Sequence, residues 1–180
     1  PQNFRNVTNG NANAPRDMIS WYQSVAFSRW LDAKYHEHGL FGQFPAGDWQ
    51  IRLPTEWEWQ WAAQGGTQAR EYPWGKWDDQ PRANTTEAGI QDRSTAVGMY
   101  PHGAADCGAL DMAGNLWEWC ANNDTDPENI AASNTSTKVL RGGAFDENQH
   151  YAAASSRNRS YPGGAYYNFG FRVVVAAPRT

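Results

Sequence analysis

Cysteine and histidine are the side chains of this sequence best suited to nucleophilic or metal chemistry. The chain holds two cysteines, Cys107 and Cys120, and a cysteine reacts or binds a metal as its thiolate. Two cysteines are too few for a disulfide scaffold; they could form one bridge, but two buried thiols are the commoner arrangement. Among the four histidines, only His36 and His38 are closely spaced, and a lone H-x-H is more often surface than ligand. These spacings do not favour a metal-centred enzyme.

Charge and hydropathy argue against two kinds of partner. With 15 basic and 19 acidic residues the net charge is −4, and Arg157 and Arg159 form the only loose basic concentration, so we expect no nucleic acid as a partner. The longest apolar run, residues 173–177, is far shorter than the ~20 residues of a membrane span, so no membrane insertion is expected. A chain of 180 residues suits one domain.

Tyrosines gather in the segment 144–168, which is otherwise rich in small and polar residues. They are Tyr151, Tyr161, Tyr166 and Tyr167, with Ala, Ser, Gly, Asn and Asp between them. Antibody paratopes have this composition, because rigid aromatic rings supply contact area while small residues leave room. The alternative is a loop whose tyrosines pack internally. The composition therefore indicates a binding surface without naming its ligand.

Two helices are expected upstream of this segment. The first begins with Ser20 as N-cap and Gln23 closing a capping box, and runs to about Tyr35. The second has Thr55 as N-cap, with Glu58 three residues later, and stops at the glycines 65–66. The apolar faces are expected to be Trp21, Val25, Ala26, Phe27, Trp30 and Leu31 in the first helix and Trp57, Trp61 and Ala62 in the second, with Trp59 off the face.

Beyond residue 71 the pattern predicts short antiparallel strands joined by long loops. Short apolar pieces alternate with turn residues at 72–75, 97–101, 115–119, 138–143 and 169–175. Residues 1–15, rich in Asn, Gly and Pro, indicate an N-terminal arm or linker, and residues 16–180 a single domain. The fold class is therefore expected to be α+β, with two helices on a small antiparallel sheet and much coil.

Six motifs in one order give this chain a resemblance to a known family. They are ISWYQSVAFSRWL (19–31), RLPTEWEWQWAAQGG (52–66), YPWG (72–75), GALDMAGNLWEW (108–119), VLRGGAF (139–145) and NFGFRV (168–173). Together they resemble the formylglycine-generating-enzyme (sulfatase-modifying factor) superfamily. The resemblance covers nearly the whole chain and implies a C-type-lectin-like fold.

The resemblance also implies where catalytic residues would stand. Enzymes of this family use two copper-binding cysteines between the RGG and GFR motifs, and here those positions carry Gln149 and Ala154. Neither glutamine nor alanine can replace a thiolate as ligand or nucleophile. Since no cysteine follows Arg141, we expect no copper and no catalysis of the family's kind.

A structural calcium ion is a further implication of the resemblance. The family's calcium site at the GNxWEW turn corresponds to Asp111, the backbone carbonyls of Gly114 and Leu116, and the Glu118 carboxylate. All are oxygen donors, as calcium requires. The alternative is that Glu118 forms a salt bridge or caps a backbone. A second family site near Asn84 and Thr85 does not align cleanly and stays open.

The location of segment 144–168 also resembles the variable region of variable proteins from diversity-generating retroelements. In those proteins, mutagenesis changes the ligand-binding surface on a fixed lectin-like scaffold. We therefore expect a non-catalytic ligand-binding protein whose partner is another protein, on a cell surface, with an extracellular, cell-surface or virion-displayed location. The ligand-binding residues are predicted to be Asp146, Asn148, His150, Tyr151, Ser156, Asn158, Ser160, Tyr161, Gly163, Tyr166 and Tyr167. The alternatives are a formylglycine-generating-type oxidase or related metal-dependent enzyme, and an adhesion domain of fixed specificity.

Overall fold

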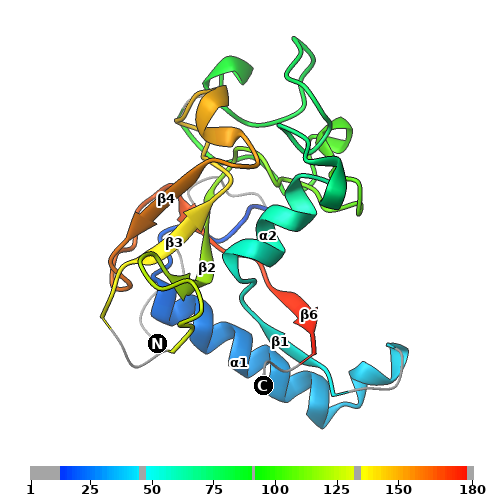
Figure 1. Ribbon diagram of the computed structural model, residues 1–180, viewed down its shortest axis with the longest axis vertical. Coiled ribbons are helices and arrows are strands. Elements are labelled where there is room, and N and C mark those ends of the chain that lie inside the picture. The colour runs from blue at the N-terminus through cyan, green and yellow to red at the C-terminus, as the bar shows by residue number, and fades with distance from the viewer. Residues whose placement is uncertain (1–12, 45–47, 91, 132–134, 178–180) are drawn as a thin grey trace.

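Two helices and two small sheets, joined by long ordered loops, make up the molecule in a computed structural model that describes residues 13–44, 48–90, 92–131 and 135–177 (Figure 1). The α-helices are α1 (Trp21–Glu37) and α2 (Glu56–Ala63). The strands are β1 (Gln50–Arg52), β2 (Trp117–Asn123), β3 (Lys138–Arg141), β4 (Arg157–Ser160), β5 (Phe169–Gly170) and β6 (Val174–Ala176). Short 3-10 helices are η1 (Leu40–Gln43), η2 (Gly66–Gln68), η3 (Thr86–Ala88), η4 (Pro101–Gly103) and η5 (Gln149–Ala152). The predicted α+β class is confirmed.

The larger sheet has the strand order β4-β3-β2-β5, and β1 pairs with β6 in a separate two-stranded sheet. Strands β2, β3 and β4 are antiparallel neighbours, whereas β5 runs parallel to β2. In Figure 1, α1 lies along one side beneath both sheets, and β4 forms the outer edge of the larger one. This edge strand belongs to the tyrosine-bearing segment.

Both helices begin where the sequence predicts. Ser20 accepts a hydrogen bond from the Gln23 amide while the Gln23 side chain accepts from the Ser20 amide, which makes a complete capping box. Thr55 and Glu58 form the same reciprocal pair at the start of α2. These signals are local, so they act whatever the tertiary context.

Two apolar clusters cover opposite faces of the larger sheet, because neighbouring residues of β2 point to opposite sides. Trp117 and Trp119 pack with Trp21 of α1 on one face. Cys120 packs with Trp59 of α2 on the other. Three of these core tryptophans donate their indole N–H groups: Trp21 to the Cys120 carbonyl and Trp119 to the Ile19 carbonyl, both at 2.8 Å, and Trp59 to the Glu118 carboxylate at 2.7 Å.

The predicted helix faces were correct only in part: Trp21 and Val25 of α1 and Ala62 of α2 pack in the core as expected, but other members of both faces are exposed. In α1, Ser24 and Ser28 are buried beside Trp21, whereas Phe27 and Trp30 are exposed. Each serine hydroxyl donates to the backbone carbonyl four residues earlier, so polar groups are satisfied where the helix packs closely.

In α2 the buried residues are Glu56, Trp59 and Ala63, and both Trp57 and Trp61 are exposed. The reason is tertiary: Trp59 faces Glu118 of β2, and its ring lies against Gly142 at the end of β3. Apolar character alone does not show which side of a helix meets the sheet.

Some predicted strands are also corrected. Residues 72–75 form a tight turn closed by a Tyr72–Gly75 bridge, and residues 97–101 form a turn that leads into η4. Strands β1 and β4 were not predicted. Most of the predicted arm, residues 1–12, lies outside the described residues, while Asn13 exchanges hydrogen bonds with Val97. Within the described ranges, no helix is long and apolar enough to cross a membrane.

Candidate functional site

Segment 144–168 leaves the sheet through the two glycines that follow β3. Gly142 and Gly143 both have left-handed φ angles, +97° and +73°. A Cβ atom on Gly143 would lie 2.8 Å from the Tyr151 carbonyl oxygen, so the backbone approaches too closely for any side chain there. The LRGG motif thereby folds the start of the segment back against η5.

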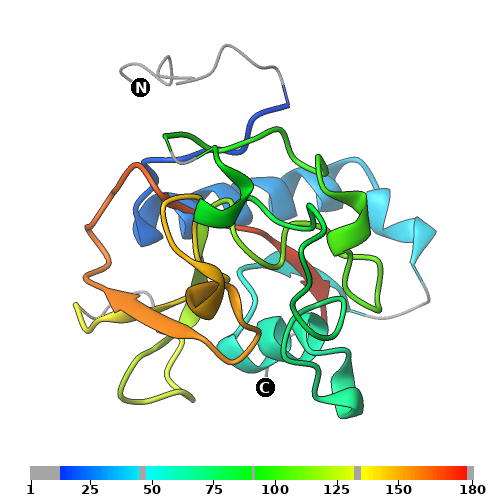
Figure 2. The same ribbon diagram turned by 90° about the horizontal axis from the view of Figure 1, so that it is seen from above.

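None of the predicted ligand-binding residues is buried. The exposed ones are Asn148, His150, Tyr151, Tyr161, Gly163, Tyr166 and Tyr167, and the half-buried ones are Asp146, Ser156, Asn158 and Ser160. Figures 1 and 2 show the segment passing through η5 and β4 along one side of the molecule. The predicted residues therefore lie before, along and after β4 in this segment.

The η5 turn presents the first group. The Asn148 side chain accepts a hydrogen bond from the His150 amide at 3.0 Å, which caps the turn. The Gln149 amide donates to a Glu87 carboxylate oxygen at 2.9 Å, so this turn rests on η3. Tyr151 is exposed and its ring lies edge-on to the buried Trp117, with 6.3 Å between centroids. This turn is thus well ordered and still solvent-facing.

Residues after β4 present the second group. Among the large hydrophobic side chains that the structure describes, Tyr161 is the most exposed, at 72%. The next residue, Pro162, is buried and its carbonyl accepts from the Trp21 amide at 3.1 Å, which fastens the loop to the start of α1. Tyr166 is exposed and packs edge-on against Phe169, with 5.0 Å between centroids.

Asp146 links the two ends of the segment. Its carboxylate accepts a hydrogen bond from the Tyr167 hydroxyl at 2.8 Å and from the Asn168 amide nitrogen at 3.1 Å. The hydrogen bond to Asp146, together with the charges of Asp146 and Glu147, raises the pKa of Tyr167. The Tyr167 hydroxyl therefore remains protonated at neutral pH and acts as a hydrogen-bond donor.

The two positions that the resemblance assigns to catalytic cysteines lie on η5 and just after it. Gln149 is half-buried on η5, and Ala154 is buried with its amide donating to the Glu71 carbonyl at 2.8 Å. Cys107 is exposed and Cys120 is buried, and both are free thiols. Burial raises the pKa of Cys120 well above its usual value, so this thiol stays protonated.

Three of the four residues predicted to bind calcium, Asp111, Leu116 and Glu118, line a small cavity, but the guanidinium of Arg172 already lies there. Arg172 donates to both carboxylate oxygens of Glu118, one of them at 2.7 Å, and to the carbonyls of Leu110 and Asp111. Gly114 lies where a Cβ atom would be 2.2 Å from the Asn84 carbonyl oxygen, so this close approach requires glycine.

The donor set therefore fits calcium only in part, because Glu118 would have to share its charge with Arg172. In the described part of the chain, no group of three or more His, Cys, Asp or Glu residues is placed to hold a metal. The buried Asn84 side-chain oxygen has no hydrogen-bond partner there, at the second site that the resemblance leaves open. Calcium binding stays a prediction.

The fold and the segment together define a C-type-lectin-like domain of the formylglycine-generating type. The family model described as "Sulfatase-modifying factor enzyme 1-like domain" matches residues 1–177, and the chain belongs to this family. The formylglycine-generating enzyme of Streptomyces coelicolor is 30% identical, over 100% of this chain and 58% of the relative.

Two further similar proteins have names that do not state an enzymatic activity. "Inactive C-alpha-formylglycine-generating enzyme 2" of Bos taurus is 32% identical, over 71% of this chain and 45% of the relative. The structure of Treponema denticola variable protein 1 superposes with a TM-score of 0.71 and 25% identity, over 92% of this chain and 72% of that one. The chain spans about half the length of the two curated relatives.

Proposed function

We propose that this chain is a ligand-binding protein in which segment 144–168 presents variable side chains on a fixed scaffold. The observation that carries the proposal is the exposure of Tyr151, Tyr161, Tyr166 and Tyr167 in a segment that lies between the buried strands β3 and β5. Tyrosines of this kind are typical binding anchors, because each offers a large rigid area at little entropic cost. The likeness to a protein named variable protein 1 supports the same conclusion.

Catalysis of the formylglycine-generating kind is the second candidate, since the Streptomyces relative bears that name. It requires thiolates that Gln149 and Ala154 do not supply. We therefore expect no copper site and no oxidation of a substrate cysteine. A peptide carrying a sulfatase cysteine, incubated with the protein, Cu(I) and oxygen, should yield no aldehyde that a hydrazide probe can trap. Aldehyde formation above a protein-free control would overturn this part of the proposal.

The expected ligand is the surface of another protein, with neither nucleic acid nor a lipid bilayer as partner. Large aromatic side chains beside small polar ones suit a folded protein surface, where anchors enter pockets and polar neighbours set specificity. The proposed location is extracellular, on a cell surface or on a virion, where such a surface meets its partner. A domain of fixed specificity would share all these features except sequence variation.

Binding by this surface is tested with two display libraries of equal size. One randomises Tyr161, Tyr166 and Tyr167; the matched control randomises the equally exposed Trp57 and Trp61 of α2 together with Val97. Both are selected against the same panel of unrelated purified proteins. The proposal predicts target-specific clones from the first library in clear excess. Equal yields from both libraries would contradict it.

A further inference from the structure

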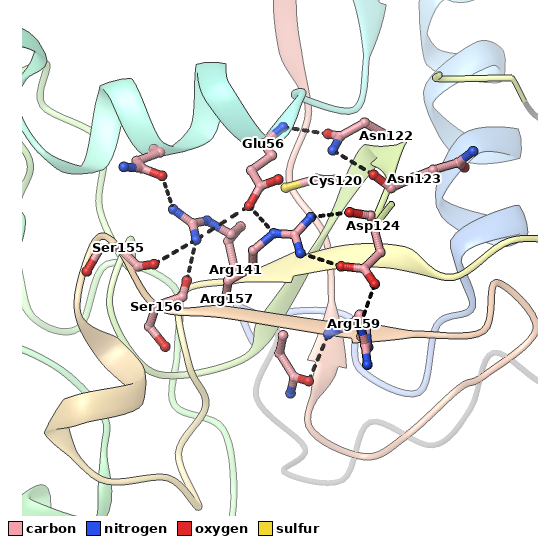
Figure 3. Close-up of polar contacts among 12 residues, drawn as sticks. Glu56, Cys120, Asn122, Asn123, Asp124, Arg141, Ser155, Ser156, Arg157 and Arg159 are labelled. Atoms are coloured by element: carbon pink, nitrogen blue, oxygen red, sulfur yellow. Dashed lines mark hydrogen bonds and ion pairs between the residues drawn. The ribbon is translucent and has the colours of Figure 1, made fainter. Parts of the chain in front are cut away.

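Strand β4 carries two arginines that reach back into the scaffold. Arg157 donates from Nε to a Glu56 carboxylate oxygen at 2.6 Å, forms an ion pair with Asp124, and donates to the Asp124 carbonyl at 2.9 Å. Arg159 donates to the other Asp124 carboxylate oxygen at 2.7 Å. Figure 3 shows the Arg157 guanidinium between the two carboxylates. These contacts form a clamp, which consists of Glu56, Asp124, Arg157 and Arg159.

Both carboxylates of the clamp are buried, with 4% of the Glu56 and 2% of the Asp124 side chain exposed. A buried carboxylate is costly unless a cation faces it. Burial alone would raise the pKa of Asp124, but the hydrogen bonds and charges of Arg159 and Arg157 outweigh it and hold that pKa below its usual value. Among the residues that the structure describes, the cations paired with Asp124 are Arg157 and Arg159, and both belong to the tyrosine-bearing segment.

The clamp joins elements that are far apart in sequence. Glu56 begins α2, Asp124 directly follows β2, and both arginines lie on the edge strand β4. A further arginine on β3, Arg141, lies 3.6 Å from Glu56 and donates to the carbonyls of residues 154, 155 and 156, just before β4. An edge strand has only one neighbour in its sheet, so these side-chain contacts add to what pairing with β3 provides.

The other two residues of β4 face away from the clamp. Successive residues of a strand point to opposite sides, so Asn158 and Ser160 lie opposite Arg157 and Arg159. A Cβ atom on Gly164 would lie 3.0 Å from both the Ser160 hydroxyl oxygen and the ring of Tyr166, so this side of β4 faces the loop that bears the exposed tyrosines. The side chains of Arg157 and Arg159 are 36% and 65% exposed, and Asn158 and Ser160 are half-buried, so the two sides of β4 differ in what they contact: the buried carboxylates on one side and the tyrosine-bearing loop on the other.

We propose that Arg157 and Arg159 are positioning residues that hold β4 on the scaffold, while Asn158 and Ser160 are free to vary and set specificity. The assignment of specificity rests on the proposed binding function; the clamp itself does not. We therefore expect variation to alternate along β4: Arg157 and Arg159 stay constant, whereas Asn158 and Ser160 vary.

The clamp is tested by saturating codons 157–160 one at a time in the full displayed chain and selecting folded molecules by resistance to thermolysin. We expect Asn158 and Ser160 to accept most residues, whereas folded clones keep Arg157 and enrich Arg159. The purified pair Arg157→Gln and Asn158→Gln provides a matched comparison, because the same residue is placed on either side of one strand. Loss of the buried ion pairs should lower the melting temperature of Arg157→Gln by roughly 5–10 °C, and Asn158→Gln should change it by less than about 2 °C.

Hydrogen exchange separates positioning from general destabilisation. Under native conditions, Arg157→Gln should speed exchange of the β4 amides bonded to β3, leave β2 protected, and be rescued in part by Arg157→Lys. Free variation at Arg157, or uniform loss of protection, would overturn the clamp. These measurements use no ligand, so an invariant segment in nature would refute the variable binding surface and leave the clamp standing.

Discussion

Replacing the exposed tyrosines with alanine should lower the free energy of unfolding only slightly, and the exposure and contacts of each ring indicate by how much. Tyr161 is 72% exposed and, in the part of the chain that the structure describes, stacks on no other ring. Surface substitutions of this kind usually change stability by about 0.5 kcal/mol or less. For a domain of this size, Tyr161→Ala should therefore shift the melting temperature by no more than about 2 °C.

Replacing Tyr166 or Tyr167 with alanine should lower the free energy of unfolding by more, because each of these rings packs against a phenylalanine ring. Tyr166 packs on Phe169 and Tyr167 on Phe145, and an aromatic pair contributes about 0.5–1.5 kcal/mol. The exposed hydrogen bond from Tyr167 to Asp146 adds about 0.5–1 kcal/mol. The double variant Tyr166→Ala/Tyr167→Ala should lose roughly 2–3 kcal/mol and remain folded, since domains are stable by about 5–15 kcal/mol.

A buried tyrosine gives the matched control. Tyr72 is 2% exposed and packs on Trp74 and Trp77, so Tyr72→Ala should cost about 3–5 kcal/mol. Urea unfolding followed by tryptophan fluorescence measures all these variants. If Tyr161→Ala lost more than about 2 kcal/mol, the ring would belong to the core, and the reasoning from exposure to binding would fail.

Three further predictions concern pH and calcium. Burial lowers the pKa of Lys138 to about 8, so between this pH and about 10.5 the unfolded chain binds a proton that the folded chain lacks. The free energy of unfolding should therefore gain a contribution that rises with pH over this range. Urea unfolding of wild type and of Lys138→Met at several pH values measures this contribution as the difference between them. Burial would raise the pKa of Glu58, but Arg52 and Thr55 lower it to about 2. The contribution of the Glu58 carboxylate to stability is therefore complete above pH ~4.5 and is lost as the pH falls toward 2. Arg52→Gln should make the melting temperature depend less on pH in this acid range. Millimolar calcium should raise the melting temperature of wild type and not of Asp111→Ala, and no shift in wild type would contradict the calcium prediction.

The sequence predicts what short-range signals determine. Both capping boxes were confirmed, because each involves groups three residues apart. The buried side of α2 was not predicted, since Trp59 is buried against a strand about sixty residues later while Trp57 is exposed. Strand β4 could not be predicted from alternating apolar residues, because its sequence contains none. Ion pairs of its arginines take the place of apolar packing on one side of the strand.

The candidate site shows the same division. The exposure of the tyrosines was predicted from the composition of segment 144–168 and is confirmed. The role of Arg157 was missed, because its partners Glu56 and Asp124 are 101 and 33 residues away in the chain. The two arginines that alternate in this short segment, Arg157 and Arg159, are the sequence signal for these ion pairs.

Sequencing the gene across its natural population tests the central claim most directly. We predict substitutions concentrated between codons 144 and 168, among them the exposed Tyr161 and the half-buried Asn158 and Ser160, with Arg157 and the flanking motifs 141–143 and 170–172 constant. Such a pattern would identify a diversified binding surface. A segment as invariant as its flanks would contradict the account and favour a binder of fixed specificity.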